Sequence, residues 1–362
     1  MIDRETFSIE WVNKINEELH WKRPGNQLKN IEKAITALYL LECLTESDLK
    51  FIFKGGTSLL LLLQKVQRFS VDIDVLVDDI DDFNKISLQF FKELIAKNDF
   101  FTEVTADERE GDALTNTYHY RFYYEPFVNQ GEKSYILLDV YHSHNYYDEV
   151  VEAEICSDIL NTTGKNATAL IPSINCLLAD KLTAFAPETI GISLAAEPGK
   201  RPKRVEVMKQ LYDIGNLFEH CDKLQAIINT YKKVATYEIE RRDLSITYSE
   251  TLQDTLRHAY ILGFAGLEEI EKHKQFMDGL KDFRRFVADL SFDETNAILM
   301  AARVAYITTL IIVEGTVVEF YSADIGMESW GINKKGYESF NSYKQSNPEA
   351  FYYWFRAIEI NA

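Results

Sequence analysis

The residues from Lys54 to Val75 join a tight glycine turn to a strand of alternating polar and apolar residues. The pair Gly55-Gly56 lets the backbone turn sharply and approach a ligand closely. The pair Thr57-Ser58 favours the start of a helix, whose first free N–H groups form an anion site. The pattern predicts a strand, a turn, a helix over 59–66 and a second strand. This order of elements is typical of a fold that mixes α and β structure.

Two carboxylates project from one face of the second strand. Asp72 and Asp74 are separated by one residue, and apolar residues alternate with them at Val71, Ile73 and Val75. Because side chains two residues apart on a strand share a face, the carboxylates form a polar row with Ser70 while the other face is buried. Two adjacent carboxylates suit Mg²⁺, or Mn²⁺, together with substrate phosphates. The competing interpretation is a solvated strand end, since an acidic run follows at Asp78, Asp79, Asp81 and Asp82.

Both halves of this stretch resemble the signature of a known family. Lys54-Gly55-Gly56-Thr57-Ser58-Leu59 and Arg68-Phe69-Ser70-Val71-Asp72-Ile73-Asp74 are similar to the Gly-Gly-Thr-Ser-Leu and Arg-Phe-Ser-x-Asp-Ile-Asp motifs of AbiEii/AbiGii-type nucleotidyltransferases. These are toxins of type IV toxin–antitoxin pairs within the DNA polymerase β-like superfamily. Leu178–Ala184 and Leu211–Ile214 resemble the family's later lysine and aspartate motifs, although Lys209-Gln210 stands where the family often has Arg-Asp. The resemblance covers roughly the first two-thirds of the chain.

The resemblance implies an α/β (α+β) fold: a polymerase β-like nucleotidyltransferase domain with a small mixed sheet, followed by a helical C-terminal domain. It implies transfer of a nucleoside monophosphate from a nucleoside triphosphate (NTP) to an acceptor, with release of pyrophosphate. Some relatives modify the 3′ end of transfer RNA, so tRNA is the expected acceptor, and a cognate antitoxin encoded nearby is the expected partner. The expected catalytic residues are Asp72, Asp74, Asp139, Lys181 and Asp213, the first three also binding metal. The expected nucleotide-binding residues are Gly55, Gly56, Thr57, Ser58, Arg68, Ser70 and Lys181.

Asp139 is the expected third carboxylate of the site. Residues 118–124 and 134–141 are rich in aromatic and β-branched residues, with turn residues at 129–131 between them, which predicts a hairpin. Asp139 is the only charge in the apolar core of the second strand, and a buried carboxylate needs a partner. The resemblance implies metal binding or general-base chemistry for it. The alternative is a strand-end aspartate hydrogen-bonded to a turn.

Helical periodicity places one lysine on an apolar face. Lys181 shares that face with Ile174, Leu177, Leu178, Leu182 and Phe185, so its amine must reach an anion or extend to solvent. A triphosphate is the expected partner, and an ion pair with a structural carboxylate is the competing interpretation. Asp213 lies off the face formed by Leu211, Ile214 and Phe218. The alternative to the implied catalytic role is that Asp213 is exposed or paired with a neighbour such as Lys181 or Arg204.

A basic segment interrupts an otherwise acidic chain. Five positive charges stand close together, at Lys200, Arg201, Lys203, Arg204 and Lys209. The net charge of −18 argues against general binding of polyanions, because phosphate contacts supply most non-specific affinity for nucleic acids. We expect the first four of these residues to bind the acceptor or the incoming triphosphate, and a solvated loop before a helix is the alternative. A basic antitoxin would also complement the acidic chain.

The composition predicts a globular protein with more than one core. At 362 residues and 46% hydrophobic content, two or three cores are expected, and we place a nucleotidyltransferase domain at 1–220 and a helical domain at 221–362. Four scattered cysteines without a Cys-x-x-Cys pair argue against a disulfide framework or zinc ribbon and favour the cytoplasm. The longest apolar run, 305–313, is too short to span a bilayer, so no membrane role is expected.

Two other classes of function remain open from the sequence. An antibiotic-modifying nucleotidyltransferase would share the metal site and offer an acidic pocket to a cationic drug, which is compatible with the negative net charge. A non-catalytic module that binds a nucleotide or a partner is less favoured, because all the expected carboxylates are present.

Overall fold

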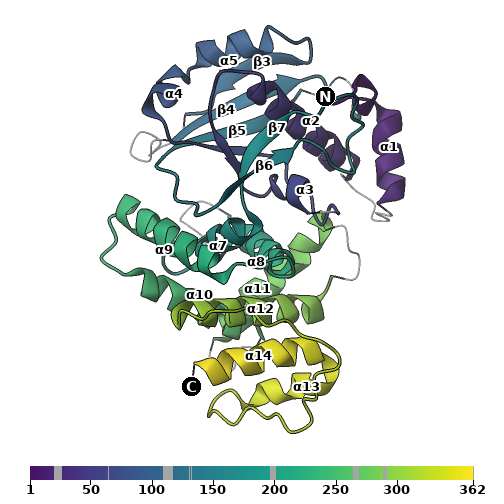
Figure 1. Cartoon of the computed structure of the whole chain (residues 1–362). Coiled ribbons are helices and arrows are strands. Elements are labelled where there is room, and N and C mark those ends of the chain that lie inside the picture. Colours follow the sequence, from purple (N-terminus) through teal and green to yellow (C-terminus); the bar gives the residue numbers. More distant parts are fainter. Residues whose placement is uncertain are drawn as a thin grey trace. The chain divides into compact units, whose positions relative to one another are not determined.

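The chain forms two compact units (Figure 1). The computed structural model describes residues 1–19, 27–63, 65–108, 117–129, 131, 133–195, 201–263, 269–287 and 292–361. Within these residues, the sheet unit comprises Met1–Asn145, Val150–Ser173 and Phe286–Leu290. The helical unit comprises Tyr146–Glu149, Ile174–Arg285 and Ser291–Ala362.

A 7-stranded mixed sheet is the centre of the sheet unit. Its strands are β1 (Ile52–Lys54), β2 (Ile73–Val77), β3 (Phe101–Ala106), β4 (Thr117–Tyr124), β5 (Ser134–His142), β6 (Val150–Glu154) and β7 (Thr168–Pro172). They lie in the order β3-β4-β5-β2-β1-β7-β6. The pairs β2–β5 and β1–β7 are parallel, and the other neighbours are antiparallel. The strand that carries the paired carboxylates, β2, therefore lies in the interior of the sheet.

One face of the sheet is apolar and covered by helices. The hydroxyl of Tyr124 on β4 donates to Glu32 of α2 at 2.9 Å, and Phe91 of α5 packs against Tyr120 of β4 with ring centroids 4.5 Å apart. Because side chains alternate along a strand, the residues of β4 with odd numbers, such as His119, lie on the opposite face. The covering helices are α2 (Gln27–Thr45), which contacts β2, β5 and β7, and α5 (Leu88–Ile95), which contacts β3.

Short helices complete the sheet unit. They are η1 (Arg4–Thr6), α1 (Ile9–Glu18), α3 (Leu59–Leu62) and α4 (Ile80–Lys85). Ser8 caps α1 by accepting a hydrogen bond from the backbone N–H of Trp11, whose indole donates to the carbonyl of Ile159 at 2.9 Å. Asp79 caps α4 in the same way, through the N–H groups of Asp81 and Asp82. The acidic run after β2 thus includes the start of a helix.

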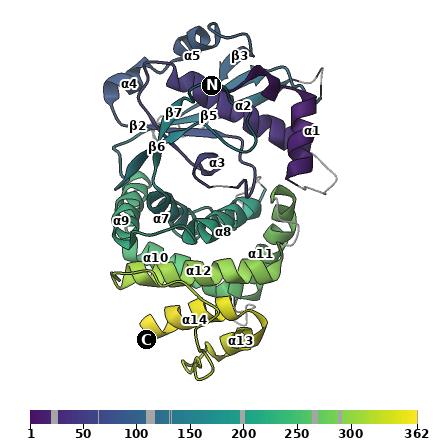
Figure 2. The same ribbon diagram turned by 45° about the vertical axis from the view of Figure 1, so that its right-hand side comes forward.

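The helical unit is built from packed α-helices (Figure 2). Helix α12 lies between α8 and α14 and also contacts α10, while α7 contacts α8 and α9. The bounds are α7 (Ile174–Ala184), α8 (Arg204–Phe218), α9 (Leu224–Arg241), α10 (Tyr248–Gly263), α11 (Ile270–Phe283), α12 (Glu294–Ile312), α13 (Tyr343–Ser346) and α14 (Pro348–Ile360). Two 3₁₀ segments, η2 (Arg284–Phe286) and η3 (Glu338–Ser342), follow α11 and precede α13.

Helix α12 is long and apolar enough to cross a membrane by length and composition alone. Of its most apolar window, 78% is buried inside the structure. Ala301, Ala305 and Tyr306 have no exposed surface, and the helix contacts α8, α9, α10, α11 and α14 of the same unit. It therefore occupies the position of a core helix.

The predicted mixed fold with a helical second part is confirmed, and the predicted hairpin is the pair β4–β5. Three strands, β3, β6 and β7, were not predicted. Of these, β6 carries exposed Glu152 and Glu154, so it lacks a clear apolar pattern. The helix predicted over 59–66 is wrong in length, because Leu63 already has extended backbone angles and α3 is a single turn.

The two compact units divide after Ser173, whereas the sequence suggested a boundary between residues 220 and 221. The reason is packing. Helices α7 and α8 precede the suggested boundary, yet they bury their apolar faces against α9, α11 and α12. The change from strand to helix at residues 172–174 was the better signal, since β7 ends at Pro172 and α7 begins at Ile174.

Candidate active site

A row of chargeable side chains crosses the sheet on its open face. In the strand register, Asp74 of β2 lies opposite Asp139 of β5, and Asp139 lies opposite His119 of β4. On the other side, Asp74 lies opposite Lys54 of β1. Residues in register on neighbouring strands point to the same face, so the four side chains share the face opposite the one that Tyr124 and α2 cover.

Asp139 has a close partner in this row. Nδ1 of His119 lies 2.6 Å from Oδ1 of Asp139, and each residue is only 9% exposed. An ionised carboxylate can only accept hydrogen bonds, so Nδ1 donates to it. The sequence predicted that a buried Asp139 needs a partner, and the histidine on the neighbouring strand supplies it.

The predicted carboxylate pair is more accessible than Asp139. Asp72, immediately before β2, is exposed, and Asp74 is half-buried. The hydroxyl of Tyr141 donates to Oδ1 of Asp74 at 3.4 Å, and Nζ of Lys54 lies 5.3 Å from the centroid of the Tyr141 ring. The face thus combines two reachable carboxylates with an ordered phenol and an amine.

The glycine pair allows the turn to lie directly against these side chains. Gly55 has φ +82°, and a Cβ at this position would lie 2.2 Å from Oδ2 of Asp74. A Cβ on Gly56 would lie 2.6 Å from Nη2 of Arg68 and 2.9 Å from Oγ of Ser70. The two glycines are therefore required by space, and Gly55 also by its backbone conformation. The turn brings four of the predicted nucleotide-binding residues, Gly55, Gly56, Arg68 and Ser70, close to one another or to Asp74.

Thr57 and Ser58 hold the turn together rather than capping a helix. Both are fully buried. The hydroxyl of Thr57 donates to the backbone carbonyl of Asp72 at 2.6 Å, and that of Ser58 donates to the carbonyl of Gly55 at 2.8 Å. Ser58 makes no side-chain cap, and the helix that follows is one turn long. The predicted capping role is wrong, because the Thr57 hydroxyl bonds to Asp72 and the Ser58 hydroxyl closes the turn itself, while the anion site at the turn stays a prediction.

Arg68 and Ser70 lie on the segment that leads into β2. Arg68 is 6% exposed, and its Nη1 donates to the carbonyl of Phe69 at 3.2 Å. A backbone bridge joins Arg68 to Val287. Ser70 is half-buried, and its hydroxyl lies beside Gly56 as described above. The guanidinium is therefore anchored by the fold close to the glycine turn.

Lys181 and Asp213 form a buried ion pair in the helical unit. Nζ of Lys181 on α7 lies 3.1 Å from Oδ2 of Asp213 on α8, and the two residues are 7% and 2% exposed. The prediction that Lys181 faces inward is confirmed. The prediction that Asp213 lies off the buried face is wrong, since α8 is enclosed by α7, α11 and α12 and has little exposed surface at this position. Pairing with Lys181 was the alternative named for it.

The basic segment is described in part. Lys200 lies outside the described residues. Arg201 and Lys203 are exposed, and Nη1 of Arg204 lies 3.0 Å from Oδ2 of Asp278 on α11. Two of the four predicted acceptor-binding residues are therefore open to solvent in the helical unit, and a third is held by an ion pair.

The open face of the sheet fits a hard divalent cation. Asp72, Asp74 and Asp139 offer only carboxylate oxygens, the donors that Mg²⁺ and Mn²⁺ prefer. Asp74 and Asp139 are in register on parallel strands, which lie about 4.8 Å apart in a sheet. Asp72 precedes Asp74 by two residues. The carboxylates can thus converge on one side of the sheet.

A second group of potential metal ligands occurs in the helical unit. Glu188, Asp254 and His258 have ligand atoms within 4.8 Å of one another. Glu188, however, forms ion pairs with Arg257 and Lys272, and Oδ2 of Asp254 accepts from the backbone N–H of Glu188 at 2.8 Å. The two cations already neutralise the glutamate. This group therefore has the character of a structural ion-pair network.

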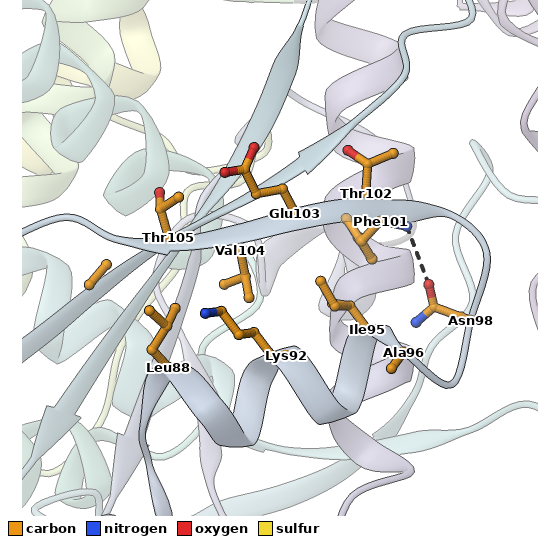
Figure 3. A pocket seen from close by; sticks show the side chains of 11 residues that line it. Leu88, Lys92, Ile95, Ala96, Asn98, Phe101, Thr102, Glu103, Val104 and Thr105 are labelled. Carbon is orange, nitrogen blue, oxygen red and sulfur yellow. Dashed lines mark hydrogen bonds between the residues drawn. The ribbon is translucent and has the colours of Figure 1, made fainter.

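An open pocket of about 590 Å³ lies between α5 and the edge strand β3 (Figure 3). Ile95, Phe101 and Val104 contribute apolar surface, and Lys92 and Glu103 contribute charges. None of the predicted site residues lines it. The pocket is separate from the carboxylates and the glycine turn.

Sequence reasoning missed His119 and Tyr141 as members of the site. Both stand in the aromatic strands that predicted the hairpin, and each looks like ordinary strand packing. A usable signal existed: pairing 118–124 with 134–141 in the correct register sets His119 opposite Asp139. The turn at 129–131 alone left that register open.

Comparison with known proteins identifies the family. Residues 39–303 match the family model described as "Nucleotidyl transferase AbiEii toxin, Type IV TA system". The match contains the glycine turn, β2, β5, and both helices that carry Lys181 and Asp213. No curated protein matches the chain. The chain belongs to the AbiEii family of nucleotidyltransferase toxins of type IV toxin–antitoxin systems.

Proposed function

We propose that the open face of the sheet binds a divalent metal ion and an NTP, and that the enzyme transfers the nucleoside monophosphate to the 3′ end of a tRNA. The observation that carries this proposal is the register of Asp74 and Asp139 on adjacent parallel strands, with Asp72 close by. A bound metal ion would stabilise the charge that develops on the transferred phosphoryl group. A cognate antitoxin and an NTP are the partners that the family implies.

The residues of the sheet unit have distinct roles in this proposal. Asp72 and Asp74 hold the metal ion, and Asp139 supplies a further carboxylate for it or accepts the proton of the acceptor hydroxyl. Gly55 and Gly56 let the backbone approach the phosphates, because neither has a side chain in the way. Arg68 contributes a fixed positive charge beside Gly56, suited to phosphate oxygens. Thr57 and Ser58 act through the shape of the turn.

Lys181 and Asp213 are proposed as a second charged element of the enzyme. The Asp213 carboxylate holds the Lys181 amine at 3.1 Å. The amine therefore has a defined position, and the pair as a whole is neutral. If an NTP approached Lys181, the amine could exchange the Asp213 carboxylate for a phosphate oxygen. Lys181 then neutralises charge on the phosphates, and Asp213 orients it.

The metal site is tested by conservative amide substitutions. Asp72→Asn and Asp74→Asn keep the size of the side chain and remove one ligand charge each. We expect transfer from α-labelled NTP to total tRNA to fall on the order of 10²–10³-fold, as loss of several kcal/mol of transition-state stabilisation requires. Asp78→Asn is the matched control, because Asp78 follows the same strand and is exposed. Wild-type rates in Asp74→Asn would exclude the metal site.

The acceptor is tested by charge reversal in the basic segment. Arg201→Glu with Lys203→Glu should abolish labelling of tRNA yet leave NTP binding intact, because phosphate contacts hold a nucleic acid and weaken with salt. Lys334→Glu with Lys335→Glu changes the net charge equally at two exposed positions and should leave labelling unchanged. Equal labelling by both double variants would remove the segment from the mechanism. Label on a cationic antibiotic and none on RNA would instead support drug modification.

A further inference from the structure

The contact between His119 and Asp139 joins the only histidine of the carboxylate row to its most buried carboxylate. The two residues are opposite each other on β4 and β5, and Nδ1 of His119 lies 2.6 Å from Oδ1 of Asp139. Their side chains are 8% and 12% exposed. Asp74, the in-register neighbour on the other side of Asp139, is half-buried and reachable. Asp139 on β5 therefore lies between Asp74 on β2 and His119 on β4.

We propose that His119 is a positioning residue for Asp139, an inference that rests on the proposed function. A hydrogen bond to Oδ1 restricts rotation of the carboxylate about its Cβ–Cγ bond, and it therefore fixes Oδ2 as well. Within the described residues Oδ2 makes no hydrogen bond, so it is the oxygen that can serve a cation or the acceptor hydroxyl. Outer partners of this kind typically change metal affinity or activity about 10–100-fold when removed.

Burial is what gives this hydrogen bond its influence. A carboxylate in water changes its orientation freely, whereas one that is 12% exposed has few alternative partners. Asp72, which is exposed, has no such restriction from burial. The structure therefore assigns to His119 the hydrogen bond that fixes the orientation of the Asp139 carboxylate.

The atom that donates the hydrogen bond provides a sharp test. In His119→Asn the side-chain amide nitrogen can occupy the place of Nδ1, so the hydrogen bond to Asp139 is kept. In His119→Gln the amide nitrogen reaches the place of Nε2 instead, so the hydrogen bond is lost although the side chain is larger. A structural role that depends on size predicts the opposite order, with the shorter asparagine as the more harmful change.

The experiment measures Mn²⁺ affinity of the full chain in the absence of NTP, by calorimetry, together with kcat and KM for NTP. We expect His119→Gln to weaken Mn²⁺ binding and kcat by about 10–100-fold with little change in KM, and His119→Asn to stay within a few-fold of wild type. Thermal melting of each variant confirms that it is folded. Asp74→Asn serves as the reference for a lost metal ligand.

Two results would overturn the inference in different ways. If wild type binds Mn²⁺ and Asp74→Asn does not, while His119→Gln equals wild type, the positioning role is wrong and the metal site stands. The same conclusion follows if the asparagine and glutamine variants are equally impaired. If wild type itself binds no Mn²⁺, the proposed metal site fails, and the role of His119 fails with it.

Discussion

Two pairs of charged residues from the family-like motifs, one pair in each unit, differ in exposure. In the sheet unit, Asp72 is exposed, and Asp74 is half-buried on the face of the sheet opposite the one that Tyr124 and α2 cover. In the helical unit, Lys181 and Asp213 are 7% and 2% exposed and neutralise each other at 3.1 Å. Charges that remain reachable can act on a ligand at little cost to the fold, whereas a buried pair cannot lose one partner without leaving an uncompensated buried charge. The same family signature thus includes residues with different energetic roles.

The largest expected effect on stability is that of Asp213→Ala. It leaves the buried amine of Lys181 without its carboxylate, and breaking a buried pair in this way costs about 3–5 kcal/mol of unfolding free energy. Asp72→Ala, at an exposed position, should leave the melting temperature nearly unchanged. Urea unfolding of both variants measures the contrast. Equal stability of the two variants would show that burial does not determine how much each charged residue contributes to stability.

The double variant Lys181→Met with Asp213→Ala checks the cause of that loss. Methionine keeps the length of the lysine stem and removes its charge, so the double variant should be more stable than Asp213→Ala alone.

Thiol labelling shows which unit opens. Cys43 lies in the sheet unit and Cys221 in the helical unit, and burial raises the pKa of both thiols to about 12. Asp213→Ala should accelerate alkylation of Cys221 more than that of Cys43.

The second prediction concerns the space beside Asp74. Gly55→Ala places a methyl group where Oδ2 of Asp74 now lies, and displacement of a reacting group by about 1 Å can cost on the order of 10²-fold in rate. Gly164→Ala is the matched control, since Gly164 also has positive φ (+69°) but no atom within 4 Å of its added Cβ. Both variants carry backbone strain of about 1–2 kcal/mol. Only Gly55→Ala should lose transfer activity.

The sequence predicted the parts of the site that depend on local patterns. Alternation predicted that Asp72 and Asp74 share a face, and the strand register places Asp74 in the row with Asp139. A lone charge in an apolar strand was enough to predict a partner for Asp139. The contacts that depend on how the strands pair could not be predicted from the sequence. The choice of His119 as that partner follows from the register of β4 and β5, which short-range turn signals do not determine.

Helical periodicity was a weaker guide in the second unit. It placed Lys181 on a buried face correctly, although α7 also buries residues outside that face, such as Asn175 and Thr183. It failed for Asp213, because α8 has neighbours on several sides and buries residues outside its main apolar face. The compact units divide before α7 and not after α8, because the neighbours that enclose α7 and α8 come later in the chain, and a pattern within either helix does not reveal them.

The smallest expected effect is that of Thr57→Val, which tests whether the turn acts through its internal hydrogen bonds. Valine preserves the shape of the buried threonine but removes the hydroxyl that donates to the carbonyl of Asp72 at 2.6 Å. We expect a loss of about 1–3 kcal/mol in unfolding free energy, together with a several-fold fall in kcat, because the carbonyl loses its donor and Asp72 is no longer tied to the turn. Thr57→Ser is the control, since it keeps the hydroxyl and loses only a methyl group, worth about 0.8 kcal/mol. A direct role of the hydroxyl in phosphate binding predicts instead that Thr57→Val raises KM for NTP at unchanged stability. Chemical denaturation combined with steady-state kinetics of the two variants separates these roles.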